Sequence, residues 1–414
     1  MTRYFSEETG FFGKMNPNEL TAKYGSPLYV YNEGIFRQKI RDMKNLVSYE
    51  NFIPNYSIKA NSNLQLLKIA KEEGIYADAM SPGEIFILLN AGFKPEEIFY
   101  VSNNVSDEEM LYAIEKGITV SIDSLSQLEK YGKLDPGGKV AVRFNPGVGA
   151  GHHEKVITGG KKTKFGVNTE KADVVLATAE KYNLKIIGIN QHIGSLFLDI
   201  DPYIEAAGSL LYLADKFRDL EFVDLGGGFG IQYMKQQGKR GFDLKAAGEK
   251  LGVFMNDFAE RYGRKIMFKT EPGRYIAAES CILLGTVHAL KENSGTRYIG
   301  TDLGMNVLVR PSMYDSHHDI EVYRQGCIVR DIETEEVTVV GNICETGDIM
   351  AKNRMLPVIR EGDILGVMDA GAYGYSMSSN YNNRLRPAEV LVRIDGTDII
   401  VRKRDTLEGL LRNF

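Results

Sequence analysis

The chain is poor in cysteine and in clustered positive charge. Its three cysteines, Cys281, Cys327 and Cys344, are too few and too scattered to form a disulfide framework, and none lies in a Cys-x-x-Cys pair. We therefore expect a reducing, cytoplasmic compartment. No basic run is longer than Arg402-Lys403-Arg404, and the net charge is −5. The sequence thus predicts no nucleic-acid partner.

Signals for secretion or membrane insertion are also missing. The segment MTRYFSEETG at the start of the sequence has no apolar stretch of the signal-peptide type. No uninterrupted apolar run approaches the ~18 residues that a membrane-spanning helix needs. We expect a protein that folds in water and has no membrane partner.

The composition is that of an ordinary globular protein. Of the 414 residues, 43% are hydrophobic and 25% are charged, so a sizeable core can be buried. A chain of this length exceeds the usual size of a single core, which predicts one large domain and one smaller domain.

From about Tyr29 to about Arg274, short β-type runs alternate with stretches of helical periodicity such as Leu64–Glu73 and Asp107–Lys116. This alternation is typical of an α/β fold with a parallel sheet. The candidate strands are Phe52–Ile58, Tyr76–Met80, Ile98–Val101, Ile118–Ile122, Lys139–Asn145, Ile186–Gln191, Glu221–Leu225 and Ile266–Thr270. Eight βα units over about 245 residues match a closed (β/α)8 TIM-type barrel. A doubly wound open sheet is the alternative.

After Arg274 the pattern changes to β-rich runs. They are Ser280–Leu290, Arg297–Asp302, Cys327–Asp331, Val337–Ile343, Asp363–Asp369, Val390–Ile394 and Ile399–Lys403. Their spacing, with turns such as Asp395-Gly396, predicts an antiparallel β domain. We assign residues 29–275 to the barrel and 276–414 to the β domain, and expect residues 1–28 to pack on the β domain.

Several unusual residues fall at or just past the ends of the predicted barrel strands: Lys59, Asp78, His192, Gly226–Gly228 and Glu271. In a closed barrel these positions converge on one face, where active sites lie. Lys59 follows an apolar run that can shield its amine, lower its pKa and let it attack an aldehyde. A solvated lysine is the simpler interpretation of Lys59 alone, and the convergence argues against it.

The glycine run Asp224–Gly230 provides backbone N–H groups that can approach a phosphate. It lacks the third glycine of the dinucleotide fingerprint and the lysine of a nucleotide P-loop, which argues against nucleotide binding. Glu271 and Arg274 place a carboxylate and a guanidinium together. The carboxylate can keep a pyridine nitrogen protonated and the guanidinium can bind a carboxylate or phosphate. A tight turn and an ion pair are the structural alternatives.

Histidines form two further features of the sequence that bear on binding. His192 in His192-Ile193-Gly194-Ser195 can stack its ring on a cofactor, and the Ser195 hydroxyl can bind phosphate, although a lone histidine is more often structural. The pairs His152-His153 and His317-His318 lack metal-ligand spacing with nearby cysteines or acids. We predict no metal site.

Six ordered motifs together resemble the diaminopimelate decarboxylases. They are Tyr56-Ser57-Ile58-Lys59-Ala60-Asn61, His192-Ile193-Gly194-Ser195, Asp224 to Gly230, Glu271 to Arg274, Cys344-Glu345 and Asp369-Ala370-Gly371-Ala372-Tyr373-Gly374. This family belongs to the alanine-racemase-like class of pyridoxal-phosphate enzymes, with a barrel and a C-terminal β domain. The resemblance covers nearly the whole chain.

The resemblance implies a role for each residue of the cofactor site. Lys59 would hold pyridoxal 5′-phosphate covalently, His192 would stack on its ring and Glu271 would protonate its pyridine nitrogen. The remaining cofactor-binding residues implied are Asp78, Ser195, Gly227, Gly228, Gly273, Arg274 and Tyr373.

The resemblance also implies a substrate site and a reaction. Arg274, Arg310 and Tyr314 would bind a distal carboxylate, Glu345 would face a distal ammonium, and Tyr373 would contribute. Cys344 would donate a proton and would reach the active site of the neighbouring subunit, so a homodimer is implied. The reaction would convert meso-2,6-diaminopimelate to L-lysine and carbon dioxide, the last step of lysine biosynthesis.

Two positions depart from the commonest family pattern. Thr346 stands where Cys-Glu-Ser-Gly-Asp usually has serine, and Leu196 follows His-Ile-Gly-Ser where glycine or glutamine is usual.

Other functions remain as alternatives. A decarboxylase of lysine, ornithine or arginine would not need Arg310, and a racemase would need a second acid/base residue, usually tyrosine, opposite Lys59. A catalytically silent homologue acting as a binding partner would not need both Lys59 and Cys344.

Overall fold

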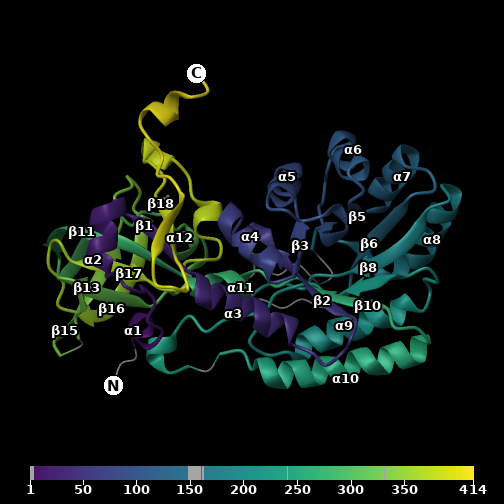
Figure 1. The fold of residues 1–414 in the computed structure, drawn as a ribbon, viewed down its shortest axis with the longest axis horizontal. Helices are drawn as coiled ribbons and strands as arrows, with labels where there is room; N and C mark the ends of the chain where they lie inside the picture. Colours follow the sequence, from purple (N-terminus) through teal and green to yellow (C-terminus); the bar gives the residue numbers. More distant parts are fainter. Residues whose placement is uncertain (1–3, 148–159, 161–162, 240, 331) are drawn as a thin grey trace. The chain divides into compact units, whose positions relative to one another are not determined.

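The computed structural model describes residues 4–147, 160, 163–239, 241–330 and 332–414. These residues form two compact units (Figure 1). The barrel unit comprises Lys39–Ile231 and Gly241–Ile276, and the β unit comprises the residues up to Gln38, Gln232–Arg240 and Ala277–Phe414. Within the described ranges, no helix is both long and apolar enough to cross a membrane. Most of the glycine-rich segment 146–163, including both histidines at 152 and 153, lies outside these ranges.

Eight parallel strands close into a ring in the barrel unit. They are β2 (Phe52–Ser57), β3 (Tyr76–Ala79), β4 (Ile98–Tyr100), β5 (Thr119–Ile122), β6 (Lys139–Asn145), β8 (Lys185–Asn190), β9 (Phe222–Asp224) and β10 (Met267–Thr270). The pairing of β5 with β6 closes the ring, and the two-residue strand β7 (Val167–Asn168) lies beside β6. All eight predicted strands form, so the closed barrel is confirmed over the open sheet.

Helices occupy the connections between the barrel strands (Figure 1). They are α4 (Leu64–Glu72), α5 (Pro82–Asn90), α6 (Asp107–Glu115), α7 (Leu125–Leu134), α8 (Ala172–Lys181), α9 (Asp201–Ala214) and α10 (Leu244–Tyr262). Another helix, α3 (Glu33–Lys44), precedes the first barrel strand. Ser81, Ser106 and Ser124 precede α5, α6 and α7, and the side chain of each accepts a hydrogen bond from the backbone N–H of the third residue of its helix. Such caps satisfy N–H groups that have no partner within the helix and so define where it begins.

Side chains fill the interior of the barrel. Phe99 of β4 and Phe222 of β9 meet edge to face with ring centroids 5.2 Å apart. Because β4 and β9 are not neighbours in the ring, these side chains meet across the interior. Gly188 lies where a Cβ would come within 2.2 Å of the Phe222 ring, so a larger residue there would displace the aromatic side chain.

The β unit is built on a ten-stranded sheet. Its strands are β1 (Leu28–Asn32), β11 (Cys281–Asn293), β12 (Thr296–Thr301), β13 (Ile320–Arg324), β14 (Cys327–Ile328), β15 (Thr334–Val340), β16 (Ile349–Pro357), β17 (Ile364–Val367), β18 (Ala388–Val392) and β19 (Asp398–Arg402). The sheet is mostly antiparallel, but β1 pairs with β18 and β12 pairs with β15 in parallel. The predicted antiparallel β domain is therefore confirmed, with these two parallel pairings inside it.

The N-terminal segment contributes to the core of the β unit. It forms α1 (Phe5–Glu8) and α2 (Pro17–Tyr24), and Phe11 and Leu20 pack in one buried cluster with Ile282 and Val390. The unit also takes in β1, which contains Tyr29, where we placed the start of the barrel. The sequence of a fully buried strand has the same apolar pattern in the barrel as in the sheet of the β unit. Only the pairing of β1 with β11 and β18 assigns β1 to the sheet of the β unit.

Candidate active site

Chemically reactive residues follow the strands of the barrel. Lys59 lies in the 3-10 turn Ile58–Ala60 directly after β2, His192 follows β8, Gly226–Gly228 follow β9, and Glu271 comes directly after β10. The carboxyl ends of the parallel strands share one end of the barrel, where active sites of this fold lie. The structure therefore brings together residues that the sequence placed at one face.

Asp78 and Lys59 belong to one buried electrostatic network. The Ser57 hydroxyl donates a hydrogen bond to Oδ2 of Asp78, which is fully buried. Burial raises the pKa of the Asp78 carboxyl well above its usual range, nearby Glu271 raises it further, and the positive charge of Lys59 opposes both. The amine of Lys59 is therefore close enough to influence the acids of neighbouring strands.

Glu271 is the most unusual of these side chains. Its residue is 2% exposed, and within the described part of the chain its Oε1 atom has no hydrogen-bond partner. Burial raises the pKa of Glu271 to about 8, Asp224 adds to the rise, and the charge of Lys59 opposes it. A buried carboxyl group with an unsatisfied oxygen is costly unless a bound group completes it. Glu271 is therefore suited to share a proton with a basic nitrogen.

The imidazole of His192 lies beside this carboxyl group. Its Nδ1 atom is 3.8 Å from Oε2 of Glu271. Burial lowers the pKa of His192 well below its ordinary value, and the positive charges of Lys59 and Arg143 lower it further. The ring is consequently neutral, a flat surface that can stack on an aromatic ligand.

The glycine turn after β9 has no room for side chains. A Cβ on Gly226 would lie 2.2 Å from the carbonyl oxygen of Gln191, and one on Gly227 would lie 2.0 Å from that of Glu271. Gly228 has a φ of +112°, a backbone conformation that other residues rarely adopt. The turn therefore presents bare backbone, as anion-binding turns do.

Arg274 and Ser195 form a second polar group at this end of the barrel. Arg274 begins α11 (Arg274–Ala277) and is 7% exposed. Its Nη2 atom donates to the Ser195 hydroxyl at 2.9 Å. A Cβ on the preceding Gly273 would lie 3.0 Å from the Cβ of Ser57, so the chain passes close to β2 there.

The structure adds Arg143, which the sequence did not single out, and a specific role for Asp224, the first residue of the glycine run. Arg143 of β6 is 7% exposed, and its charge lowers the pKa values of both Glu271 and His192. Asp224, which is fully buried, accepts a hydrogen bond from the N–H of Gly226 at 2.9 Å and braces the glycine turn. A charged residue inside an otherwise apolar strand was the available signal for Arg143, because buried charges are expensive and tend to be functional.

The remaining predicted residues belong to the β unit. Arg310 and Tyr314 are the first and last residues of α12 (Arg310–Tyr314), and Arg310 is 2% exposed. Its Nη1 atom donates to the Tyr233 hydroxyl at 2.8 Å and its Nη2 atom to the Ser316 hydroxyl at 3.1 Å. Tyr373 follows β17 with a φ of +58°, which is strained for a bulky residue.

Cys344 and Glu345 lie in an exposed loop after β15. Asn382 holds Cys344 twice: its Oδ1 atom accepts from the backbone N–H of Cys344 at 3.0 Å, and its Nδ2 atom donates to Sγ at 3.1 Å. The hydroxyl of Tyr381 donates to Oε1 of Glu345. The segment that follows Tyr373 therefore supports both residues of this motif.

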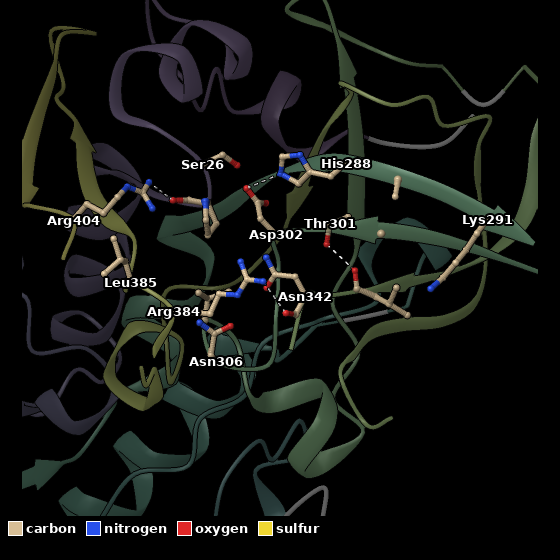
Figure 2. Close-up of a pocket in the computed structure, with 16 residues that line it drawn as sticks. Ser26, His288, Lys291, Thr301, Asp302, Asn306, Asn342, Arg384, Leu385 and Arg404 are labelled. Carbon is tan, nitrogen blue, oxygen red and sulfur yellow. Dashed lines mark hydrogen bonds and ion pairs between the residues drawn. The ribbon is translucent and has the colours of Figure 1, made fainter. Parts of the chain in front are cut away.

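Two cavities in the β unit adjoin this loop. One of about 780 Å³ is lined by both apolar and polar residues, among them Asp302, Arg384 and Arg404 (Figure 2), and none of the predicted site residues lines it. A second of about 690 Å³ contains Cys344. Asn342 and Arg384 line both cavities. Among the described residues, no group of three or more histidine, cysteine or acidic side chains is arranged to hold a metal ion.

Comparison with known proteins places the chain in a family. Residues 33–278 match the family described as pyridoxal-dependent decarboxylase, pyridoxal binding domain. The diaminopimelate decarboxylase of Methanothermobacter thermautotrophicus is 42% identical over 95% of this chain and 92% of its own length. The chain belongs to the diaminopimelate decarboxylase family.

Other members of the diaminopimelate decarboxylase family show the same extent of similarity. The Aquifex aeolicus diaminopimelate decarboxylase is 36% identical over 97% of this chain and 94% of its own. The crystal structure of the Helicobacter pylori diaminopimelate decarboxylase complexed with L-lysine has a TM-score of 0.87 and 31% identity, covering 96% of this chain and 98% of that one. Both units of the chain are thus included in the family resemblance.

Proposed function

We propose that this protein is a pyridoxal-phosphate-dependent decarboxylase that converts meso-2,6-diaminopimelate to L-lysine and carbon dioxide, the last step of lysine biosynthesis. The observation that carries the proposal is the buried carboxyl group of Glu271, whose Oε1 atom has no hydrogen-bond partner in the described residues. It lies beside His192 and the glycine turn in a chain of this decarboxylase family. Each of these features matches one part of the cofactor.

The barrel residues fit pyridoxal phosphate in three ways. Glu271 can hold a proton on the pyridine nitrogen, the neutral ring of His192 can stack on the cofactor, and the side-chain-free turn at Gly227 and Gly228 can approach its phosphate. Ser195, Gly273 and Arg274 would complete the phosphate site.

Lys59 Nζ would hold the cofactor covalently, and Asp78 and Tyr373 would provide further contacts to it. When bound, pyridoxal phosphate accepts the electron pair released as carbon dioxide leaves the substrate.

A further group of residues would recognise the substrate. We assign Arg274, Arg310 and Tyr314 to its distal carboxylate, because a guanidinium can bind a carboxylate through two parallel hydrogen bonds. Glu345 would face the distal ammonium and Tyr373 would also contribute. These groups would favour a long substrate with an amino-carboxylate at both ends.

Cys344 would complete the reaction. Its Sγ proton would pass to the substrate carbon that has lost carbon dioxide, which becomes a CH2 group. The distal centre does not react, so the product would be L-lysine when that centre has the L configuration. We further propose a homodimer in the cytoplasm, in which Cys344 and Glu345 serve the active site of the neighbouring subunit. Exposure of both residues in the isolated chain supports this part of the proposal.

The first experiment measures carbon dioxide release by the purified protein with pyridoxal phosphate. It compares meso-diaminopimelate with L-lysine, L-ornithine and L-arginine at equal concentration. Strong preference for diaminopimelate is the expected result. Turnover of only the substrates that carry a single carboxylate would support the cofactor chemistry but overturn the proposed specificity for diaminopimelate. If none of the four substrates is turned over, the protein is better explained as a catalytically silent homologue.

Two lysine substitutions, one at the proposed attachment residue and one as a control, test which lysine holds the cofactor. Lys59→Ala should abolish turnover and the absorbance band of the lysine-bound cofactor, whereas Lys68→Ala, a change of an exposed lysine on α4, should alter neither. A wild-type band in the Lys59→Ala protein would assign the attachment to another lysine.

Mixing two inactive variants tests the shared site. If Cys344 acts in the partner's site, Lys59→Ala and Cys344→Ala subunits that exchange freely should regain about a quarter of wild-type activity. Half of the dimers are then mixed, and each mixed dimer has one intact site. Mixed dimers without activity would place Cys344 in the site of its own subunit.

A further inference from the structure

The segment Gln232–Arg240 lies between β9 and α10 in the sequence, both elements of the barrel, yet it groups with the β unit. It begins two residues after the glycine run that ends at Gly230. Lys235 anchors it, because the ammonium lies 2.7 Å from each carboxylate oxygen of Asp369 and 3.0 Å from Glu279. The Lys235 side chain is 25% exposed and that of Asp369 is fully buried, so this partly buried ion pair ties the segment to Asp369.

Tyr233, two residues before Lys235, contacts the guanidinium of Arg310 in two ways. Its hydroxyl accepts a hydrogen bond from Nη1 at 2.8 Å, and its ring centroid lies 4.9 Å from Cζ of Arg310. Both side chains are buried, at 6% exposed for Tyr233 and 2% for Arg310. Hydrogen bonds to a charged group and contact with an aromatic face are both strengthened by such burial.

Two further contacts define how these side chains are held. The Ser316 hydroxyl accepts from Nη2 of Arg310 at 3.1 Å, so both terminal nitrogens of the planar guanidinium have a hydroxyl partner. On its other side, the Tyr233 ring meets the His318 ring edge to face with centroids 5.1 Å apart. Nδ1 of His318 is in turn 2.7 Å from the carbonyl oxygen of Met368. The contact with His318 thus holds the Tyr233 ring in place, and the Tyr233 hydroxyl in turn can orient the Arg310 guanidinium.

We infer that Tyr233 is a positioning residue that sets the plane of the Arg310 guanidinium for the distal carboxylate of the substrate. The inference rests on the proposed function, in which Arg310 binds that carboxylate. A guanidinium binds a carboxylate through two hydrogen bonds only when the two groups are coplanar. Tyr233 would therefore act on ligands that carry the distal carboxylate and leave other ligands unaffected.

A matched pair of ligands tests this role on the pyridoxal-phosphate-loaded protein. L-lysine keeps the distal amino-carboxylate of diaminopimelate, whereas 1,5-diaminopentane has the same chain and amines without the carboxylate. The dissociation constant of each is measured by titrating the cofactor absorbance. Tyr233→Phe keeps the ring and removes the hydroxyl, so we expect the Kd of L-lysine to rise about tenfold and that of 1,5-diaminopentane to stay unchanged.

Tyr323→Phe is the control variant. Tyr323 is also a buried tyrosine of the β unit, and its hydroxyl binds Ser6 and Glu321. This change should leave the ratio of the two dissociation constants as in the wild type. If Tyr233→Phe weakens both ligands equally, or neither, the positioning role is overturned. Ser316→Ala, which removes the second hydroxyl on Arg310, should raise the Kd of L-lysine alone and provides the same test if Tyr233→Phe folds poorly.

Arg310→Met separates this inference from the proposed function. Suppose that Arg310→Met abolishes the difference in Kd between L-lysine and 1,5-diaminopentane, while Tyr233→Phe retains this difference in full. Only the role of Tyr233 then fails. If Arg310→Met leaves the affinity for L-lysine unchanged, the substrate role of Arg310 fails and the role of Tyr233 fails with it.

Discussion

The backbone N–H of Gly227 donates a hydrogen bond to Nδ1 of His192 over 3.1 Å. A ring nitrogen that accepts a hydrogen bond cannot carry a proton, so the proton of this neutral imidazole lies on Nε2. The backbone N–H of Gly227 therefore determines the tautomer of His192.

The first prediction concerns this tautomer. His192 should remain neutral with Nε2 protonated between about pH 6 and pH 8, because burial holds its pKa well below the ordinary value near 6.5. Nitrogen NMR of histidine-labelled protein measures this, with the signal assigned by its loss in His192→Gln. Movement of both ring-nitrogen signals toward the doubly protonated position within this range would contradict the prediction.

A second prediction uses the raised pKa of Glu271, about 8 in the folded protein against an ordinary value of 4.5. Between these values the folded protein holds a proton that the unfolded chain has released. The free energy of unfolding of the cofactor-free protein should therefore fall as the pH rises from about 4.5 to about 8. Urea unfolding at several pH values should show a shallower fall in the free energy of unfolding for Glu271→Gln. Burial raises the pKa of Asp224 to about 7, so Asp224 should account for part of the fall that remains in this variant. Equal slopes for the two proteins would argue against a protonated Glu271.

In the holoenzyme, Glu271→Gln should lower kcat roughly 100-fold, the size of effect expected when one charge-stabilising group is lost. The amide can no longer keep the pyridine nitrogen protonated. Carbon dioxide release at saturating diaminopimelate measures this, and a kcat within about twofold of wild type would remove Glu271 from the chemistry.

The glycine turn supplies a third prediction. Gly227→Ala should destabilise the protein by about 1–3 kcal/mol and weaken binding of pyridoxal phosphate, because the new Cβ would lie 2.0 Å from the carbonyl oxygen of Glu271 and force the backbone apart. The matched control is Gly208→Ala within α9, where the nearest atoms, those of Phe254, are 4.0 Å away. That change should stabilise the helix by about 0.5–1 kcal/mol. Denaturant unfolding and cofactor titration distinguish the two variants, and equal behaviour would show that the turn tolerates side chains.

A fourth prediction concerns the anchor of the segment Gln232–Arg240. Lys235→Met should cost about 3 kcal/mol of stability at neutral pH, because it leaves the buried carboxylates of Asp369 and Glu279 without their cation. Burial already raises the pKa of Asp369 to about 6 against the opposing charge of Lys235. The carboxyl group of the variant can take up a proton as the pH falls, so the loss should shrink toward about pH 5.

Lys265→Ala, which removes the cation of an exposed ion pair, is the control for Lys235→Met. Its partner Glu50 lies 2.9 Å away, but the two side chains are 73% and 82% exposed. The change should alter stability by less than about 1 kcal/mol. Chemical denaturation of both variants at pH 5 and pH 7.5 measures the difference, and a pH-independent loss for Lys235→Met would contradict the electrostatic explanation.

The barrel strands were predictable because each is a short apolar run closed by a turn, as in Lys139–Asn145. In the β unit, β1, β13 and β16 were missed. β16 mixes charged and apolar residues over Ile349–Pro357 and is only partly buried, so periodicity alone does not reveal it. β1 has a clear β pattern, but its partners β11 and β18 come from the far end of the chain.

Local sequence patterns were enough to predict the reactive residues of the candidate site, because lysine, histidine, glutamate and glycine are chemically distinctive and fall at regular points of a repeating pattern. The contacts that support these residues emerge only from the folded chain. The acceptor role of His192 Nδ1, the unsatisfied oxygen of Glu271 and the hydroxyl on Arg310 supplied by Tyr233 all depend on contacts between residues distant in sequence. Burial and hydrogen-bond geometry arise only when those segments meet, so no local pattern encodes them.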